Sequence, residues 1–215
     1  MIEIIDGNKL NSRFHDIAVL IDVFRATSSI LVMLKKGVSY IVPAATVEEA
    51  YALSQKYKNA ILAGEKDGIK VPEFEFGNSP VEYNAHDLKD KIIIFVSTNG
   101  TRVLQNIRAE KVYFASFLNA YAVSQKLKNE SDVALIAANR KDLYSVEDFK
   151  CAEYIVSLIN KDNVDYDQIK NDILSSESAD RLRELDAEED MLFCLKNNII
   201  DFVPVYKGGV IYKNE

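Results

Sequence analysis

An aspartate, an arginine and a cluster of hydroxyl side chains directly follow an apolar run near the start of the chain. Asp22 comes after the five apolar residues 17–21, and Arg25 and Thr27 follow within five positions. Carboxylates bind magnesium and also act as acids, bases or nucleophiles. A guanidinium is a planar fork that matches phosphate, carboxylate and sulfonate oxygens. The combination predicts chemistry on a small anionic compound.

Similar polar turns recur after three later apolar runs. Residues 97–102 follow the run 92–96, residues 116–119 follow 112–115, and an acidic pair at 147–148 comes after 133–137. If the strands are parallel, their carboxyl ends meet at one edge, where open α/β sheets bind ligands. The polar residues at the four strand ends are Asp22, Arg25, Thr27, Thr98, Asn99, Thr101, Arg102, Ser116, Asn119, Glu147 and Asp148.

Helix capping is the alternative explanation for these residues. Thr27, Thr101 and Ser145, taken singly, are better explained as caps, and Ser145 with Asp148 resembles a capping box. Two arginines beside hydroxyl clusters at separate strand ends favour a ligand site instead. Asp22, Glu65 and Glu147 would repel an anion unless a cation intervened, so the site predicts a hard divalent ion, most naturally Mg²⁺.

The elements that must position these residues alternate between strands and helices. The order predicts an α/β fold with a mostly parallel sheet, helices on both faces and right-handed crossovers. Residues 64–82 predict an ordered binding loop that ends in a tight turn at 77–80. Residues 165–197 are charged and largely helical, and 204–212 predict a terminal hairpin. We expect one α/β domain over 1–215, with 165–215 as a helical and hairpin extension packed on it.

Composition limits the classes of function. The net charge of −7 and the isoelectric point near 5.0 argue against binding nucleic acid or a membrane surface. Two cysteines and two isolated histidines predict neither a disulfide framework nor a zinc site. We see no signal peptide and no apolar run of membrane-spanning length, so we expect a cytoplasmic protein. Whether it forms a homodimer stays open.

Several common catalytic motifs are absent from the sequence. It contains no Gly-x-x-x-x-Gly-Lys-Ser/Thr loop, no Gly-x-Gly-x-x-Gly fingerprint and no Gly-x-Ser-x-Gly elbow. Nucleotide binding through these loops and serine hydrolase chemistry are therefore not expected.

Six segments, taken in order, resemble the 2-phosphosulfolactate phosphatase family. They are residues 21–28, 63–65, 76–80, 97–102, 116–120 and 147–152. The run 137–140, Ala-Ala-Asn-Arg, differs from the small, glycine-containing run that the resemblance leads us to expect.

The resemblance implies magnesium-dependent hydrolysis of 2-phospho-3-sulfolactate to 3-sulfolactate and phosphate, a step known from coenzyme M synthesis. The expected magnesium ligands are Asp22, Glu65 and Glu147, and the expected catalytic residues are Asp22, Arg25 and Arg102. The expected substrate-binding residues are Thr27, Asn78, Ser79, Thr98, Asn99, Gly100, Thr101, Ser116 and Asn119.

The sequence leaves the attacking group open between a water held at the metal and Asp22 itself. It also leaves two alternative functions open. One is a phosphatase for another small phosphorylated hydroxy acid, such as phosphoglycolate or phosphoglycerate. The other is a non-catalytic protein that binds small polyanionic acids.

Overall fold

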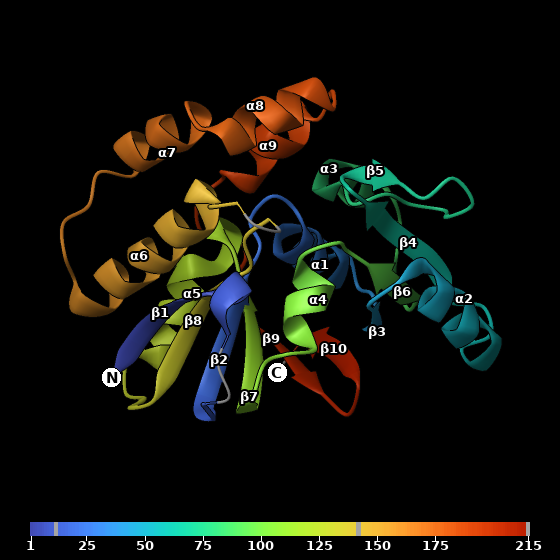
Figure 1. Cartoon of the computed structure of the whole chain (residues 1–215), viewed down its shortest axis with the longest axis horizontal. Coiled ribbons are helices and arrows are strands. Elements are labelled where there is room, and N and C mark those ends of the chain that lie inside the picture. The colour runs from blue at the N-terminus through green and yellow to red at the C-terminus, as the bar shows by residue number, and fades with distance from the viewer. Residues whose placement is uncertain (11–12, 141–142, 214–215) are drawn as a thin grey trace.

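The computed structural model describes residues 1–10, 13–140 and 143–213, and ten strands of these residues form one sheet (Figure 1). The strand order is β1-β8-β2-β7-β9-β10-β3-β6-β4-β5. The strands are β1 (Ile2–Asp6), β2 (His15–Ile21), β3 (Tyr40–Ala44), β4 (Ile61–Lys66), β5 (Ile69–Lys70), β6 (Ile92–Val96), β7 (Ala109–Ala115), β8 (Val133–Ala137), β9 (Pro204–Lys207) and β10 (Val210–Lys213).

Helices connect the strands and form most of the segment that precedes the last hairpin. The α-helices are α1 (Ala26–Lys35), α2 (Val47–Lys56), α3 (Pro80–Ala85), α4 (Gly100–Leu104), α5 (Ala120–Leu127), α6 (Val146–Asn160), α7 (Tyr166–Leu174), α8 (Glu177–Glu184) and α9 (Glu188–Cys194). The 3₁₀ turns are η1 (Gly7–Lys9) and η2 (Phe117–Asn119). No helix in the described ranges is both long enough and apolar enough to cross a membrane.

The sheet consists of two parallel groups joined by the C-terminal hairpin. Strands β1, β8, β2 and β7 form one group, and β3, β6 and β4 form the other. The hairpin β9–β10 pairs antiparallel with β7 on one side and with β3 on the other. The mostly parallel α/β sheet and the terminal hairpin are therefore confirmed. The sequence predicts the hairpin in an extension packed on the domain, whereas it lies inside the sheet; the division into domains stays a prediction.

Helices cover both faces of the first group of strands, as predicted. In β2, Leu20 belongs to the core that contains α1 and α4, while Val19 and Ile21 belong to the core that contains α5 and α6. Successive strand side chains point to opposite faces, so a strand covered on both sides is apolar at every position. This is why residues 17–21 form an unbroken apolar run.

Turn chemistry explains one strand that the sequence analysis did not predict. The loop after residue 64 begins with a short hairpin, in which Glu65 of β4 pairs with Lys70 of β5. Its turn, Asp67-Gly68, has positive φ angles of 56° and 88°. Asp-Gly is a favoured pair for such a two-residue turn. The hairpin brings Glu65 and Gly68 together and so prepares one wall of the site.

Candidate active site

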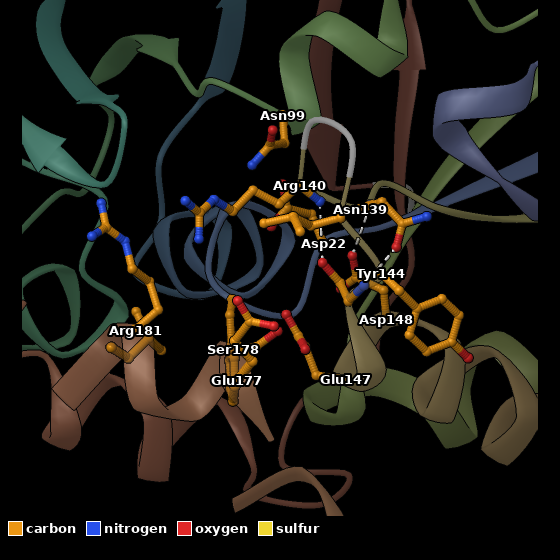
Figure 2. Close-up of a pocket in the computed structure, with 14 residues that line it drawn as sticks. Asp22, Asn99, Asn139, Arg140, Tyr144, Glu147, Asp148, Glu177, Ser178 and Arg181 are labelled. Atoms are coloured by element: carbon orange, nitrogen blue, oxygen red, sulfur yellow. Dashed lines mark hydrogen bonds between the residues drawn. The ribbon is translucent and has the colours of Figure 1, made fainter. Parts of the chain in front are cut away.

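Two adjoining cavities meet at Asp22, beyond the carboxyl ends of β2 and β6 (Figures 1 and 2). One, of about 70 Å³, has Glu147 in its wall and is called the Glu147 cavity. The other, of about 280 Å³, has Glu65 in its wall and is called the Glu65 cavity. Residues that line both are Asp22, Phe24, Asn99, Arg140, Arg181 and Leu182.

An odd number of antiparallel pairings separates the two strand groups, so their local directions are opposed. Their carboxyl ends nevertheless border the same Glu65 cavity, since Asp22 follows β2 and Thr98 follows β6. Figure 1 shows the two groups on either side of α1 and α4. The polar strand ends of the two groups therefore meet at one cavity although the groups run in opposite local directions.

Asp22 is buried at the start of the turn between β2 and α1. Its backbone N–H donates to Thr27 Oγ1 (3.0 Å), and that hydroxyl donates back to the Asp22 carbonyl (2.8 Å). A Cβ atom at Gly100 would lie 3.0 Å from Asp22 Oδ2, so glycine lets α4 approach the carboxylate. Burial raises the pKa of Asp22 to about 6, and the Glu65 charge adds to this, while the Ala26 and Gly100 amides and Arg25 partly offset it.

Glu147 lies in the first turn of α6 and faces Asp22 across the Glu147 cavity (Figure 2). Its Oε2 atom is buried and has no hydrogen-bond partner among the described residues. Burial raises the pKa of Glu147 to about 7, and the charge of Asp22 raises it further, against a hydrogen bond with Ser178. A buried carboxylate oxygen without a partner is costly unless a cation or donor satisfies it.

Asp148 joins two loops and does not form the expected capping box. Its Oδ1 accepts from the Val23 N–H (2.8 Å) and its Oδ2 from the Asn139 N–H (3.1 Å). The Ser145 hydroxyl makes no cap and accepts from the Arg140 N–H (3.1 Å). The capping-box prediction is wrong because these side chains bond to other loops. Burial, and next the charges of Glu147 and Asp22, raise the Asp148 pKa well above its usual range.

Glu65, in contrast, is fully engaged. Its Oε1 accepts from the Thr98 N–H (2.6 Å), and its Oε2 accepts from the Gly68 N–H (2.5 Å) and the Thr98 hydroxyl (3.0 Å). Three donors satisfy a buried carboxylate and fix its position. Glu65 therefore ties the turn between β4 and β5 to the end of β6.

Arg25 forms a buried ion pair that the sequence analysis missed. Its Nη1 lies 2.6 Å from Asp190 Oδ2, and its Nη2 donates to the Gly68 carbonyl (3.0 Å). The other oxygen of Asp190 accepts from the Ser79 hydroxyl (2.5 Å). In the sequence, Asp190 ends an acidic run typical of an exposed first turn. The sequence signal for a buried Asp190 was helical spacing, since Ala187 and Cys194 lie three positions before and four after it. Both are buried on the same face of the helix.

The structure brings part of the predicted site together. The predicted residues that line one or both cavities are Asp22, Arg25, Glu65, Asn78, Thr98, Asn99 and Glu147. The predicted residues that line neither are Thr27, Ser79, Gly100, Thr101, Arg102, Ser116 and Asn119. The roles assigned to all of them in binding and catalysis stay predictions.

Most residues outside the cavities have other partners. Thr101 donates to the Ser97 carbonyl (2.5 Å), and Arg102 Nη2 donates to Asn8 Oδ1 (2.9 Å). Ser116 and Asn119 cap η2 reciprocally, and Asn119 also donates to the Phe202 carbonyl (3.1 Å). Asn119 thus anchors the segment that leads to the C-terminal hairpin, and Ser116 holds η2 together.

Two arginines of the cavity walls were not predicted. Arg140 follows Asn139, whose φ of 56° lies in the left-handed region that favours glycine or asparagine. Asn139 thus adopts the left-handed conformation in the run where the resemblance leads us to expect a glycine. An asparagine at this place was the sequence signal for a functional turn next to Arg140. Arg181 comes from α8, and no local pattern identified it, because its place depends on how α8 packs over the sheet.

Within the described ranges, no three His, Cys, Asp or Glu side chains form a group that could hold a metal by itself. Magnesium commonly needs only one or two protein carboxylates, with water and substrate phosphate oxygens completing its shell. Asp22 and Glu147 fit that smaller arrangement, because Glu147 has an unpartnered buried oxygen, and burial and the nearby Asp22 charge raise the pKa of Glu147.

Comparisons with known proteins agree on one family. The family model described as 2-phosphosulpholactate phosphatase matches residues 4–209. A probable 2-phosphosulfolactate phosphatase of Thermoplasma volcanium is 37% identical over 211 residues, which cover 98% of each chain. Proteins with the same description from Thermotoga maritima and Clostridium beijerinckii are 36% and 34% identical, over 92% and 91% of this chain and 92% and 90% of their own.

Proposed function

Because the chain belongs to the 2-phosphosulpholactate phosphatase family, we propose that it hydrolyses 2-phosphosulfolactate to 3-sulfolactate and inorganic phosphate. The observation that carries the proposal is the buried carboxylate pair Asp22 and Glu147, in a cavity whose wall also holds Arg140 and Arg181 (Figure 2). Carboxylates and guanidiniums in one cavity suit a reaction in which a cation and an anionic ester meet.

Magnesium is the proposed cofactor, and Asp22 and Glu147 are the residues that would hold it. When bound, the ion supplies positive charge that offsets the charge on the phosphate oxygens and on the leaving oxygen. The proposal moves Glu65 out of the predicted ligand set, because both of its oxygens already accept hydrogen bonds. Glu65 instead holds the wall of the neighbouring cavity in place.

The remaining residues bind the ester and exclude water. The Asn99 side chain lies in the wall that both cavities share and can donate to an oxygen of the phosphate. Phe24 and Leu182 give the same wall an apolar part, which reduces competing solvent. If water attacks phosphorus, the bond to the ester oxygen breaks and the leaving oxygen takes a proton from that water to become the hydroxyl of sulfolactate. If the Asp22 carboxylate attacks instead, an aspartyl phosphate forms, and water then hydrolyses it to free phosphate and Asp22.

The test is phosphate release from 2-phosphosulfolactate by the purified protein, with added magnesium and after exhaustive chelation. Release that requires magnesium supports the whole proposal. Release that survives chelation would retain the phosphatase and reject the magnesium site. Faster turnover of phosphoglycolate or 3-phosphoglycerate would reassign the substrate, and tight binding without turnover would make the protein a binding module.

Three further expectations from the sequence stay predictions. They are the link to coenzyme M synthesis, the cytoplasmic location and the open choice between monomer and homodimer. Cell fractionation and the mass of the purified protein in solution test the last two directly.

A further inference from the structure

The two cavities contain more acidic than basic side chains, although the proposed substrate carries three anionic groups. Carboxylates in the walls are Asp22, Glu65, Asp67, Glu147, Asp148 and Glu177. In the part of the chain that the structure describes, the cationic side chains of these walls are Arg25, Arg140 and Arg181. These arginines are therefore the charged donors of the described walls for a sulfonate or carboxylate that is not bound at the metal.

Arg25 is already committed to the protein. Its guanidinium is buried, lies 2.6 Å from the Asp190 carboxylate and donates to the Gly68 carbonyl. The ion pair cancels most of its charge, and breaking it would leave Asp190 buried without a counter-charge. Arg25 therefore shapes the wall and leaves the binding of a second anion to the other two arginines.

Arg140 has a backbone held by hydrogen bonds and a guanidinium without a partner among the described residues. Its N–H donates to the Ser145 hydroxyl (3.1 Å), and its carbonyl accepts from the Asn8 side chain (3.0 Å). The guanidinium makes no hydrogen bond or ion pair with any residue in the described ranges. Figure 2 shows it extending across the cavity above Asp22, toward the side from which Arg181 enters. A fixed backbone with a free cationic end is suited to an incoming anion.

Arg181 reaches the same region from α8. Its Nη2 donates to the Asp67 carbonyl (3.2 Å), and its Nη1 lies 3.7 Å from Glu184 Oε2. These contacts hold the guanidinium at the rim and leave several of its five N–H donors for a ligand. In Figure 2 the Arg140 and Arg181 guanidiniums occupy the same side of the cavity, away from Glu147.

We propose that Arg140 and Arg181 together bind the sulfonate of the substrate and make the enzyme select esters that carry it. The inference rests on the proposed phosphatase function, in which the phosphate lies at Asp22 and Glu147. The sulfonate is one carbon further from the phosphorylated carbon than the carboxylate is, so it reaches the rim more readily. A sulfonate is ionised at all physiological pH values and offers three oxygens to two guanidinium forks. Helix α8 then belongs to the specificity site.

The experiment compares 2-phosphosulfolactate with 2-phospholactate, in which a methyl group replaces the sulfonate arm. Arg140→Gln and Arg181→Gln should each lower kcat/KM for the sulfonated ester by about 10- to 100-fold, the usual value of a charge-assisted contact. The same variants should lower kcat/KM for 2-phospholactate much less, so the ratio of the two kcat/KM values should fall. Arg181→Lys should recover part of the loss, because it restores the charge without the fork.

Arg183→Gln is the matched control. Arg183 lies on α8 two residues from Arg181, pairs with Asp180 (2.6 Å) and lines neither cavity. The variant removes the same charge from the same helix, so it should keep the wild-type ratio between the two esters. A loss that is equal for both esters in Arg140→Gln and Arg181→Gln would overturn the proposal, as would no loss for either.

Failure of the phosphatase proposal is recognised separately, as a wild-type protein that releases phosphate from neither ester. Titration calorimetry with 3-sulfolactate and with lactate then tests the arginines alone. Tighter binding of 3-sulfolactate that Arg140→Gln and Arg181→Gln remove supports the sulfonate site. Equal binding of the two acids, or binding of neither, overturns it.

Discussion

Two glutamates line the cavities that meet at Asp22, and they differ in the hydrogen bonds that their carboxylates accept. Glu65 accepts three hydrogen bonds from Gly68 and Thr98, whereas Glu147 leaves one buried oxygen without a partner among the described residues. Both are buried; Glu65 lies near the end of β4, and Glu147 lies in the first turn of α6, the helix after β8. Residue type and burial therefore do not separate a structural carboxylate from a ligand-binding one. The number of donors that surround it does.

The difference extends to the rest of each cavity. The Glu65 cavity is balanced within the protein, since Arg25 pairs with Asp190 and Glu65 with backbone and hydroxyl donors. The Glu147 cavity is not, because Asp22, Glu147 and Asp148 all have raised pKa values. A region whose carboxylates have hydrogen-bond partners has a structural task, and one with a buried carboxylate oxygen left unpartnered can accept a cation. Asp22 lies where the two meet.

The largest effect should come from Asp22→Asn. Removing the charge of Asp22 takes away a proposed magnesium ligand and the candidate nucleophile, so we expect kcat to fall by about 1,000-fold or more. Asparagine has nearly the same shape and relieves a buried charge, so the free energy of unfolding should not decrease. Phosphate release and urea denaturation measure the two quantities. Near-normal turnover would remove Asp22 from both proposed roles, ligand and nucleophile.

Stability of the metal-free protein should fall as the pH rises from about 5 to about 8. The folded pKa values of Asp22 and Glu147, about 6 and about 7, exceed the ordinary values of 3.8 and 4.5. In this window the unfolded chain has released protons that the folded chain still holds, so each step up in pH favours unfolding. The loss should be on the order of 4 kcal/mol and complete above the higher folded pKa.

Urea denaturation in chelator at the two pH values measures that loss. Added magnesium should restore stability at about pH 8 and have little effect at about pH 5, where the carboxyls are protonated. Glu147→Gln should make the free energy of unfolding depend less strongly on pH. A metal-free protein that becomes more stable over the same pH interval would contradict the proposed imbalance of the Glu147 cavity.

Breaking the ion pair between Arg25 and Asp190 should lower the free energy of unfolding by about 3 kcal/mol. Asp190→Asn leaves the Arg25 guanidinium buried without its counter-charge, a change that is strongly destabilising in protein interiors. It also weakens the bond from Ser79, which caps α3. Thermal and urea denaturation provide the measurement, with Glu189→Gln in the same helix as an exposed control. Equal stability of the two variants would show that the ion pair contributes nothing.

Sequence reasoning reached the sheet and half of the site because both follow from local patterns. Unbroken apolar runs identified buried strands, and Asp22 and Glu65 were found from their place directly after such runs. Asp190 and Arg181 could not be found in this way. Their roles depend on α8 and α9 folding back over the sheet, which is tertiary information. Ser116 and Asn119 share the strand-end pattern, yet they cap η2, and Asn119 also bonds to Phe202, just before the C-terminal hairpin.

Glu65→Gln and Glu147→Gln should change the free energy of unfolding in opposite directions, by about 2 kcal/mol each. Glu65→Gln places an amide N–H₂ against existing donors, so the free energy of unfolding should decrease. Glu147→Gln removes a buried charge with an unpartnered oxygen, so at about pH 8 the metal-free protein should gain stability while magnesium-dependent turnover falls. Paired urea denaturation and phosphate-release assays test both signs. Stability changes of the same sign in both variants would contradict the assignment of Glu65 as structural and Glu147 as ligand-binding.

The smallest effect should come from replacing Thr98, whose hydroxyl donates one of the three hydrogen bonds that Glu65 accepts. Its hydroxyl donates to Glu65 Oε2 (3.0 Å) and accepts from the Asp67 N–H (2.8 Å). Thr98→Val keeps the shape and loses both bonds, so the free energy of unfolding should fall by about 1 kcal/mol. Thr98→Ser keeps the hydroxyl and should stay close to the wild type. If valine and serine gave the same stability, the backbone donors of Thr98 and Gly68 alone would satisfy Glu65, and its contrast with Glu147 would rest on main-chain geometry.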